Sequence, residues 1–339
     1  MAYNTNTRTI TELLMATTLD NYGEKAYEQV FSRIPMFEIL EGKGRVEVKP
    51  GGEYITERVI ASKATGVSSF EGFEEVELPV QDPFKTLVYR FRNYEGPVVI
   101  AWDQMKANQG KYQIINLLSA LKDLAVKTIR DTVNTELWAK SRPKSSSIYG
   151  IPLFIVKDPT ASATVGGYDC STETWWRNIS ETSAASSYAA LMKEIRKVIH
   201  SCSDNSGEDT PDIIITDQDG YETVEGYVTE KGRWIMSDRL QKLNIALESI
   251  PIGKADLVWD SAVPNMYDTS STYSSFFFIN TKYLKWRVGS DRKGLEFTGL
   301  QRASRQIAYS GFYLMRGALI CTSRRTQGLL HKVVKTITS

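Results

Sequence analysis

The chain has 339 residues, of which 42% are hydrophobic, 24% charged and 11% aromatic, a composition typical of globular proteins that bury a core. Lysine and arginine total 41 against 40 aspartate and glutamate, which excludes an overall basic field for nucleic acid and a polyanionic chain. There is no long apolar segment, and the first residues lack the pattern of a signal peptide, so we expect a soluble cytoplasmic protein without membrane contact. Three distant cysteines, Cys170, Cys202 and Cys321, favour free thiols.

The first part of the chain predicts an arm and then a β hairpin. Residues 1–20 are rich in Thr and Asn, and residues 21–31 have the spacing of a short helix that ends before Pro35. Residues 45–49 and 54–60 both alternate in period two around a Pro-Gly-Gly turn, which is typical of a hairpin. Because such a ribbon cannot bury a core of its own, we expect it to lie on its own domain or on a neighbouring subunit.

Charged side chains on and after this hairpin are candidate contacts between subunits. A basic block is followed by an acidic block, and each block suits opposite charge on a neighbour. The alternative is a solvated hairpin whose charges serve only solubility. The candidates are Lys43, Arg45, Lys49, Arg58, Lys63, Glu71, Glu74, Glu75 and Glu77.

The longest regular pattern covers residues 102–140. Its apolar residues recur in steps of three and four, and charged residues occupy the opposite face, which predicts an amphipathic helix that ends before Pro143. A regular part over residues 111–139 makes a rod about 40 Å long, which needs a sheet to lie on. Strands predicted at residues 84–91 and 98–102 lead into this helix.

The rest of the chain predicts a mixed α/β domain and a late return strand. We expect strands at 151–156, 211–216, 255–259 and 275–280, a helix at 183–201 capped by Thr182, and a helix from Asp217 to about residue 230. Residues 306–323 form an almost continuous apolar run with two glycines, which favours a strand pair or one bent strand. If this run completes the sheet beneath the long helix, the domain between them is an insertion.

No pattern for catalysis or metal binding is complete. His200 and His331 have no triad or HExxH context, and we interpret both as structural or surface residues. No CxxC or CxxH pair occurs, so we expect neither metal nor cofactor. An SxxK at Ser141 and an SDN at Ser203 match two motifs of serine β-lactamases, but the KTG motif is absent and we interpret both matches as chance.

Five short motifs follow one another in an order shared with a known family. They are Gly166 and Gly167 with Trp175, Trp176, Arg177 and Asn178; residues 211–217; residues 256–260 with Trp259 and Asp260; residues 277–284 with Asn280; and residues 324–328. This series resembles the major capsid proteins of tailed double-stranded DNA phages over nearly the whole chain. The sequence departs from the family at residues 168–170 and at Ser323, where the family often has Arg-Ser and Asn.

The resemblance implies the Hong Kong 97 type fold, of class α+β. It implies an N-terminal arm at 1–40, an extended β-hairpin loop at 41–80, a peripheral domain at 81–149 with a spine helix at 102–140 over a sheet, an inserted α/β axial domain at 150–294, and a return to the peripheral sheet with a C-terminal tail at 295–339. Residues Gly166, Gly167, Trp175, Trp176, Arg177, Trp259, Asp260 and Asn280 are then structural residues of the family motifs.

The resemblance also implies a function. It is that of a major capsid protein, not an enzyme, which self-assembles into hexamers and pentamers of an icosahedral head around the double-stranded DNA genome. The implied partners are a separate scaffolding protein, since the arm is too short for a fused one, a portal protein, and packaged DNA held by weak non-specific contact. The implied location is the virion, with assembly in the host cytoplasm.

Three points stay open at this stage. Some members of the family crosslink a loop lysine to an asparagine of a neighbour, and Lys43, Lys49 and Lys63 are candidates although no motif requires it. An encapsulin-like nanocompartment shell shares the implied fold and is the alternative function. An enzyme, such as a hydrolase that uses Ser141, would instead be a monomer or small oligomer with a pocket.

Overall fold

The computed structural model of the chain describes residues 35–49, 51–63, 65, 67, 69, 71–73, 82–103, 111–203, 209–230, 249–268, 272–289, 295–302 and 307–335. The chain divides into two compact units. Unit 1 contains Met1–Arg33, Asn93–Asn134 and Ser290–Arg316, and unit 2 contains Ile34–Arg92, Thr135–Gly289 and Gly317–Ser339. The arm, the helix predicted at residues 21–31, and Glu74, Glu75 and Glu77 lie outside the described residues.

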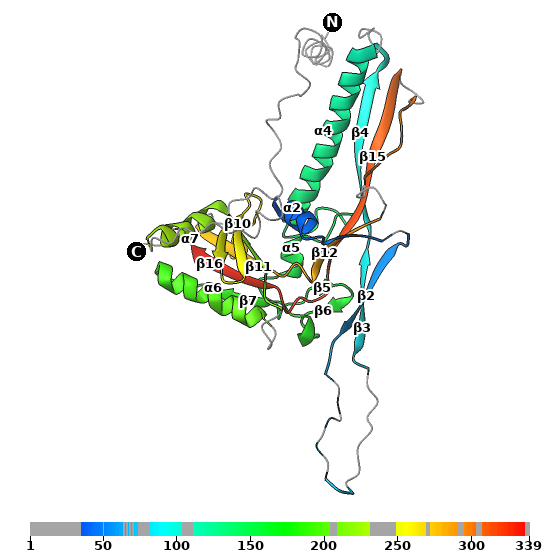
Figure 1. The fold of residues 1–339 in the computed structure, drawn as a ribbon. Coiled ribbons are helices and arrows are strands. Elements are labelled where there is room, and N and C mark those ends of the chain that lie inside the picture. Colours follow the sequence, from blue (N-terminus) through cyan, green and yellow to red (C-terminus); the bar gives the residue numbers. More distant parts are fainter. Residues whose placement is uncertain are drawn as a thin grey trace. The chain divides into compact units, whose positions relative to one another are not determined.

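Unit 1 contains most of the long helix and a group of strands that pair with one another. The predicted helix is confirmed as α4 (Lys111–Leu137), with 27 residues (Figure 1). The predicted return strand is confirmed as one continuous strand, β15 (Ala308–Cys321). In unit 1, β15 pairs with β4 (Arg92–Ala101), β13 (Leu295–Phe297) and β14 (Gln301–Arg302).

Gly96 lets β4 approach α4 closely. A Cβ at this position would lie 2.8 Å from Cδ1 of Ile129 and 3.2 Å from the carbonyl oxygen of Ala125, so a larger residue would displace the helix. Buried Val98 and Ile100 follow on the same face of β4, which gives the strand the alternation of a half-buried sheet.

In unit 2 the predicted hairpin of residues 45–49 and 54–60 is wrong in its pairing. β1 (Val46–Val48) pairs in parallel with β12 (Leu284–Val288), which in turn pairs with the last residues of β15. β2 (Tyr54–Ile60) pairs instead with β3 (Phe84–Arg90), over seven residue pairs. Glu47 lies opposite Arg287 in the β1–β12 register, so the charge that alternates along β1 finds its partner on a distant strand. A local alternation cannot reveal that choice.

A six-stranded sheet lies wholly in unit 2 and has the strand order β7-β16-β11-β8-β10-β9. Its strands are β7 (Ile179–Thr182), β8 (Ile213–Thr216), β9 (Ile250–Ile252), β10 (Ala255–Trp259), β11 (Tyr273–Ile279) and β16 (Gly328–Val334). The apolar strands predicted at 211–216, 255–259 and 275–280 are confirmed as β8, β10 and β11. Helices α6 (Tyr188–Cys202) and α7 (Gln218–Glu230) contribute to a single apolar core with this sheet.

Three local predictions in unit 2 are wrong. Residues predicted as a strand at 151–156 form the short helix α5 (Ile151–Phe154), because a proline suits the first turn of a helix and an apolar run alone does not separate helix from strand. The N-cap of α6 is Ser187, whose Oγ accepts from the N–H of Ala190. Thr182 instead belongs to strand β7 and pairs with His331 of β16. Residues 328–334 do not form a tail but the strand β16, between β7 and β11.

The prediction of free thiols is confirmed for all three cysteines. Cys170, Cys202 and Cys321 are unpaired and buried. Burial raises the pKa of Cys202 and of Cys321 to about 12, so both side chains stay protonated and pack as small apolar groups.

Candidate assembly surfaces

The β2–β3 ribbon has one face that is covered near its base and one face that is open along its length. On the covered face Ile55 pairs with Tyr89, and both side chains are buried. On the open face Ile60 pairs with Phe84, and both are exposed. Since alternate residues of a strand point to opposite faces, the ribbon presents a continuous open surface beyond its base.

Tyr89 anchors the base of the ribbon. Its hydroxyl donates a 2.7 Å hydrogen bond to the carbonyl oxygen of Cys321. Burial raises the pKa of Tyr89 well above its ordinary value, so the hydroxyl remains a donor. The Gly166 carbonyl accepts from the N–H of Val88 at 3.0 Å, and Gly166 has a φ of +66°, a conformation that favours glycine.

A charged network holds the same base. Glu47 of β1 pairs with Lys285, at 2.8 Å, and with Arg287 on β12. Arg287 also pairs with Glu57 on β2 at 2.7 Å. Arg287 is largely buried, so these pairs are less screened than surface pairs and fix the direction in which the ribbon leaves the β1–β12 strands.

The far part of the ribbon exposes large apolar side chains. The exposed fractions are 72% for Ile60, 87% for Val67, 107% for Phe73 and 61% for Phe84. Ile60 and Phe84 are paired across the ribbon, and Val67 and Phe73 lie between its two strands. Soluble proteins seldom expose several large apolar side chains within one short segment. These four side chains are therefore candidates for a contact with another molecule.

The charged residues that the sequence suggested as contacts fall into two groups in the structure. Some form contacts within the chain, and others are exposed. Lys43 forms an internal ion pair with Asp212, at 2.7 Å, and the Lys49 amine lies 3.5 Å from the Thr56 carbonyl oxygen. Arg58 and Lys63 are exposed. Contact of any of them with a second copy stays a prediction.

Two charged candidates remain, Arg45 and Glu71, and the exposed apolar residues of the ribbon were not predicted from the sequence. Arg45 is half-buried, and Glu71 is exposed near the far part of the ribbon. Sequence reasoning did not identify Ile60 and Phe84, because an alternating strand looks the same whether its apolar residues are covered or open. It also did not identify Phe73, which lies in a turn between the two strands.

The motif tryptophans pack inside unit 2. Trp176 is 1% exposed, and its indole N–H donates to the Val165 carbonyl oxygen at 2.9 Å. The guanidinium of the fully buried Arg324 lies 5.8 Å from the centre of the Trp176 ring and donates to the Phe154 carbonyl oxygen at 2.7 Å. Trp175 is half-buried and donates to Glu173. These contacts tie the 154, 165 and 324 segments together.

The turn before these tryptophans is held by hydrogen bonds to Asp169 and by Arg177. Asp169 accepts from the Ser162 hydroxyl and from the N–H of Ser171, and these bonds lower its pKa to about 2. Arg177 donates to the carbonyl oxygens of Cys170 and Ser171 at 2.7 and 2.8 Å. Gly167 completes the turn with a φ of +94°.

The other motif residues also serve mainly internal contacts. Asp260 is buried and accepts from the indole N–H of Trp138 at 3.0 Å, and burial raises the pKa of its carboxyl. Asn280 is buried and exchanges two hydrogen bonds with the side chain of Gln327. Trp259 differs, since 40% of it is exposed.

Solved structures share this architecture over the whole chain. A cyanophage A-1(L) capsid subunit matches with a TM-score of 0.65 and 12% identity, and the match covers 93% of this chain and 97% of that one. An encapsulin from Synechococcus elongatus matches with a TM-score of 0.61 and 10% identity, covering 99% and 98%. The capsid of an empty GTA particle matches with a TM-score of 0.60 and 11% identity, covering 93% and 96%. The chain has the Hong Kong 97 type fold. No protein-family model and no curated protein matches the sequence.

Within this Hong Kong 97 type fold the described residues contain few features of a ligand site. They include no group of three or more His, Cys, Asp and Glu side chains placed to hold a metal ion. They also include no helix with the length and apolarity needed to cross a membrane. A cavity of about 250 Å³ lies between β4 and α4 in unit 1, lined among others by Pro97, Leu124 and Thr128, and it is smaller than typical ligand pockets.

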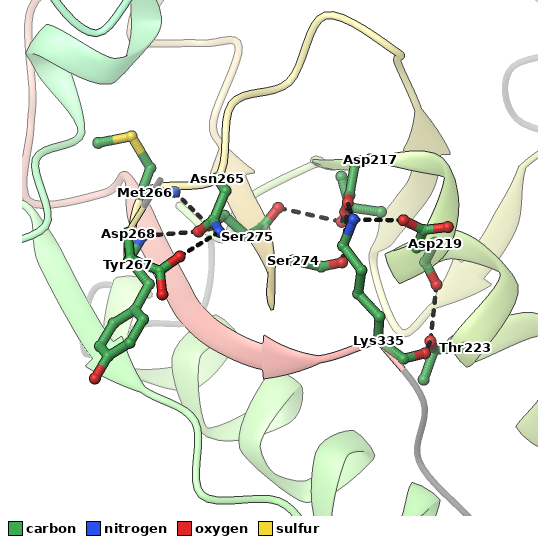
Figure 2. Close-up of polar contacts among 11 residues, drawn as sticks. Asp217, Asp219, Thr223, Asn265, Met266, Tyr267, Asp268, Ser274, Ser275 and Lys335 are labelled. Carbon is green, nitrogen blue, oxygen red and sulfur yellow. Dashed lines mark hydrogen bonds and ion pairs between the residues drawn. The ribbon is translucent and has the colours of Figure 1, made fainter. Parts of the chain in front are cut away.

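His331 is the one titratable side chain of β16 that is buried without a full set of partners among the described residues. Its ring stacks on Tyr267, with 5.8 Å between ring centres, and Nε2 lies 3.3 Å from the Thr182 hydroxyl. Nδ1 is buried and has no hydrogen-bond partner in the described part of the chain. Burial, and then the nearby amines of Lys157 and Lys332, lower the pKa of His331. Figure 2 shows the turn that carries Tyr267, in which the N–H of Met266 donates to the Ser275 hydroxyl.

This environment predicts acid sensitivity of the subunit. With a folded-state pKa below the ordinary value of 6.5, His331 binds its proton more readily in the unfolded chain. The free energy of unfolding therefore falls as the pH drops below about 6.5. We expect urea unfolding of the unassembled subunit to lose stability more steeply between pH 7.5 and 5.5 than the His331→Gln variant does. Parallel curves for the two proteins would contradict this assignment.

Proposed function

We propose that this chain is the major capsid protein of a tailed double-stranded DNA phage. It forms hexamers and pentamers that close into an icosahedral head around the genome. In this role the chain acts as a structural protein, and its function resides in surfaces rather than in a catalytic pocket.

One observation carries the proposal: the fold matches shell-forming proteins over 93% or more of the chain. The exposed apolar side chains of the β2–β3 ribbon and of the residues between its strands add support. Matches that cover 93% of this chain and 96–97% of the two capsid chains support the role of a shell subunit. The exposed Ile60, Phe73 and Phe84 support a contact with a neighbouring copy. A near-neutral net charge of +1 is favourable where many copies lie side by side.

The proposal assigns roles to the segments of the chain. Residues 41–80, with the paired strands at their base, form the extended loop that lies on the neighbour. The spine helix belongs to the peripheral domain, and residues 150–294 together with strand β16 form the axial domain near the capsomer centre. A separate scaffolding protein, a portal protein and weakly held DNA are the proposed partners, in the virion and, during assembly, in the host cytoplasm.

An encapsulin-like nanocompartment shell is the second candidate. The likeness to the Synechococcus elongatus encapsulin, at a TM-score of 0.61, favours it as much as any single capsid match favours the first. The tryptophan motif at residues 174–178 and the order of the five motifs favour the phage capsid.

Expression alone and together with candidate scaffolding proteins tests the proposal. Sedimentation velocity and negative-stain electron microscopy are the measurements. We expect rings, tubes or shells, with uniform shells only when a scaffold is present. Uniform closed shells from the chain alone would favour the encapsulin function. A species below about 100 kDa under both conditions would contradict both functions and favour an enzyme or other small oligomer.

A further inference from the structure

Helix α6 has a basic outer face. Lys193, Arg196, Lys197 and His200 are exposed and follow one another in steps of three, one and three residues, which places them on one side of the helix. Lys197 pairs with Glu181 at 3.1 Å. Within the described residues neither Lys193 nor Arg196 has an ion-pair partner. We call these four residues the basic face.

Helix α7 has an acidic outer face and no basic residue. Asp219 and Glu222 are exposed, and Glu225 is half-buried on the same side. Figure 2 shows Lys335 between Asp217 and Asp219 at the start of the helix, where its amine pairs with both carboxylates. Glu222 and Glu225 lie one and two turns further along, and no lysine or arginine of the described residues pairs with them. Asp219, Glu222 and Glu225 form the acidic face.

The helices that carry the two faces lie over different strands of one sheet. α6 packs against β7 and β16, and β7 is the edge strand on that side. α7 packs against β10 and β11, nearer the other edge. Because α6 and α7 share one core on the same side of the sheet, each copy carries a basic helix near one edge and an acidic helix nearer the other.

We propose that the basic face of α6 docks against the acidic face of α7 in the next copy of this chain. The inference rests on the proposed function, and it specifies which surfaces join the axial domains. Two different surfaces of one chain that fit each other make a head-to-tail contact, and such contacts close into rings when each step includes a fixed rotation. Opposite charge sets the partner and the register, and like charge excludes the reversed orientation.

The α6 face alone would also suit a polyanion such as nucleic acid. The matching acidic face on the same domain is what favours a second copy. Nucleic acid would leave the acidic face without a role and would be repelled by it.

Charge reversal tests the contact. The double variants K193E/R196E and E222K/E225K each place like charges against each other, and the quadruple variant restores opposite charges with their signs exchanged. The control K140E/K144E reverses two exposed lysines away from both helices. All proteins are examined by circular dichroism and then by sedimentation and electron microscopy, with the scaffold if the wild type needs it.

We expect each double variant to form rings or shells at least about tenfold less than the wild type at low salt. The quadruple variant and the control should assemble as the wild type does. In the wild type, zero-length carbodiimide coupling of mixed ¹⁴N and ¹⁵N chains should link Lys193 or Lys197 of one chain to Glu222 or Glu225 of another.

Two results would overturn the inference and leave the proposed function intact. One is normal assembly of both double variants. The other is loss of assembly that the quadruple variant does not restore, with no crosslink between the two faces. In the first case, normal rings that have lost only bound DNA in K193E/R196E would identify the basic face as a nucleic-acid surface. A wild type that never assembles would refute the proposed function together with this inference.

Discussion

Replacing Ile60, Phe73 and Phe84 together by serine is expected to abolish shell formation while the subunit stays folded. These side chains are 72%, 107% and 61% exposed, so they contribute little to the free energy of unfolding. The Ile60–Phe84 pair accounts for at most about 1 kcal/mol. In an assembled shell each of them would be covered, and a buried apolar side chain contributes about 1.5–3 kcal/mol. Loss of three such contacts at every interface weakens assembly by more than a thousandfold.

Sedimentation and thermal unfolding together check this prediction. The matched control is Thr86→Ser, an exposed substitution on the same ribbon that removes one methyl group and keeps Ile60, Phe73 and Phe84. The control should assemble normally. If the triple variant forms shells in the usual yield, the open end of the ribbon is not an assembly contact.

Trp176→Ala is expected to lower the free energy of unfolding by about 3–5 kcal/mol. The substitution removes a side chain that is 1% exposed and leaves a cavity in unit 2. It also removes the donor to the Val165 carbonyl oxygen and the ring that faces the Arg324 guanidinium. Since Arg324 is itself fully buried, the polar groups left behind add to the loss.

Urea unfolding of the unassembled subunit measures the effect of this substitution. Trp175→Ala is the matched control, because the neighbouring ring is only half-buried and its indole donates to an adjacent glutamate. We expect less than half the loss in the control. Equal losses for the two variants would mean that the pair acts as one surface cluster and not as a buried anchor.

Patterns that depend on neighbouring residues were predicted well from the sequence. The spacing of apolar residues identified α4, and short apolar stretches identified β8, β10 and β15. Pairing between strands was not predictable in the same way. β1 looks like one half of a hairpin, yet it joins β12, because the partner of a strand is chosen by contacts far along the chain.

The candidate surfaces show the same contrast between local patterns, which the sequence reveals, and distant contacts, which it does not. The sequence shows where charge lies, and Arg58, Lys63 and Glu71 are exposed, although their contact with a second copy stays a prediction. The sequence does not show that Lys43 pairs with Asp212 within the chain. Caps are similarly ambiguous. Several Ser and Thr residues precede α6, and only the backbone path selects Ser187.

The position of β16 determines when a newly synthesised chain can complete the sheet of unit 2. Among the described residues this strand comes last along the chain, yet it lies inside the sheet between β7 and β11. Until residue 334 has left the ribosome, β7 and β11 lack the strand that joins them, and their backbone groups remain open. A nascent chain therefore cannot present a finished subunit to its neighbours. We expect a chain that stops before residue 328 to lack an interior strand of this sheet and to be exposed to proteolysis in the cell.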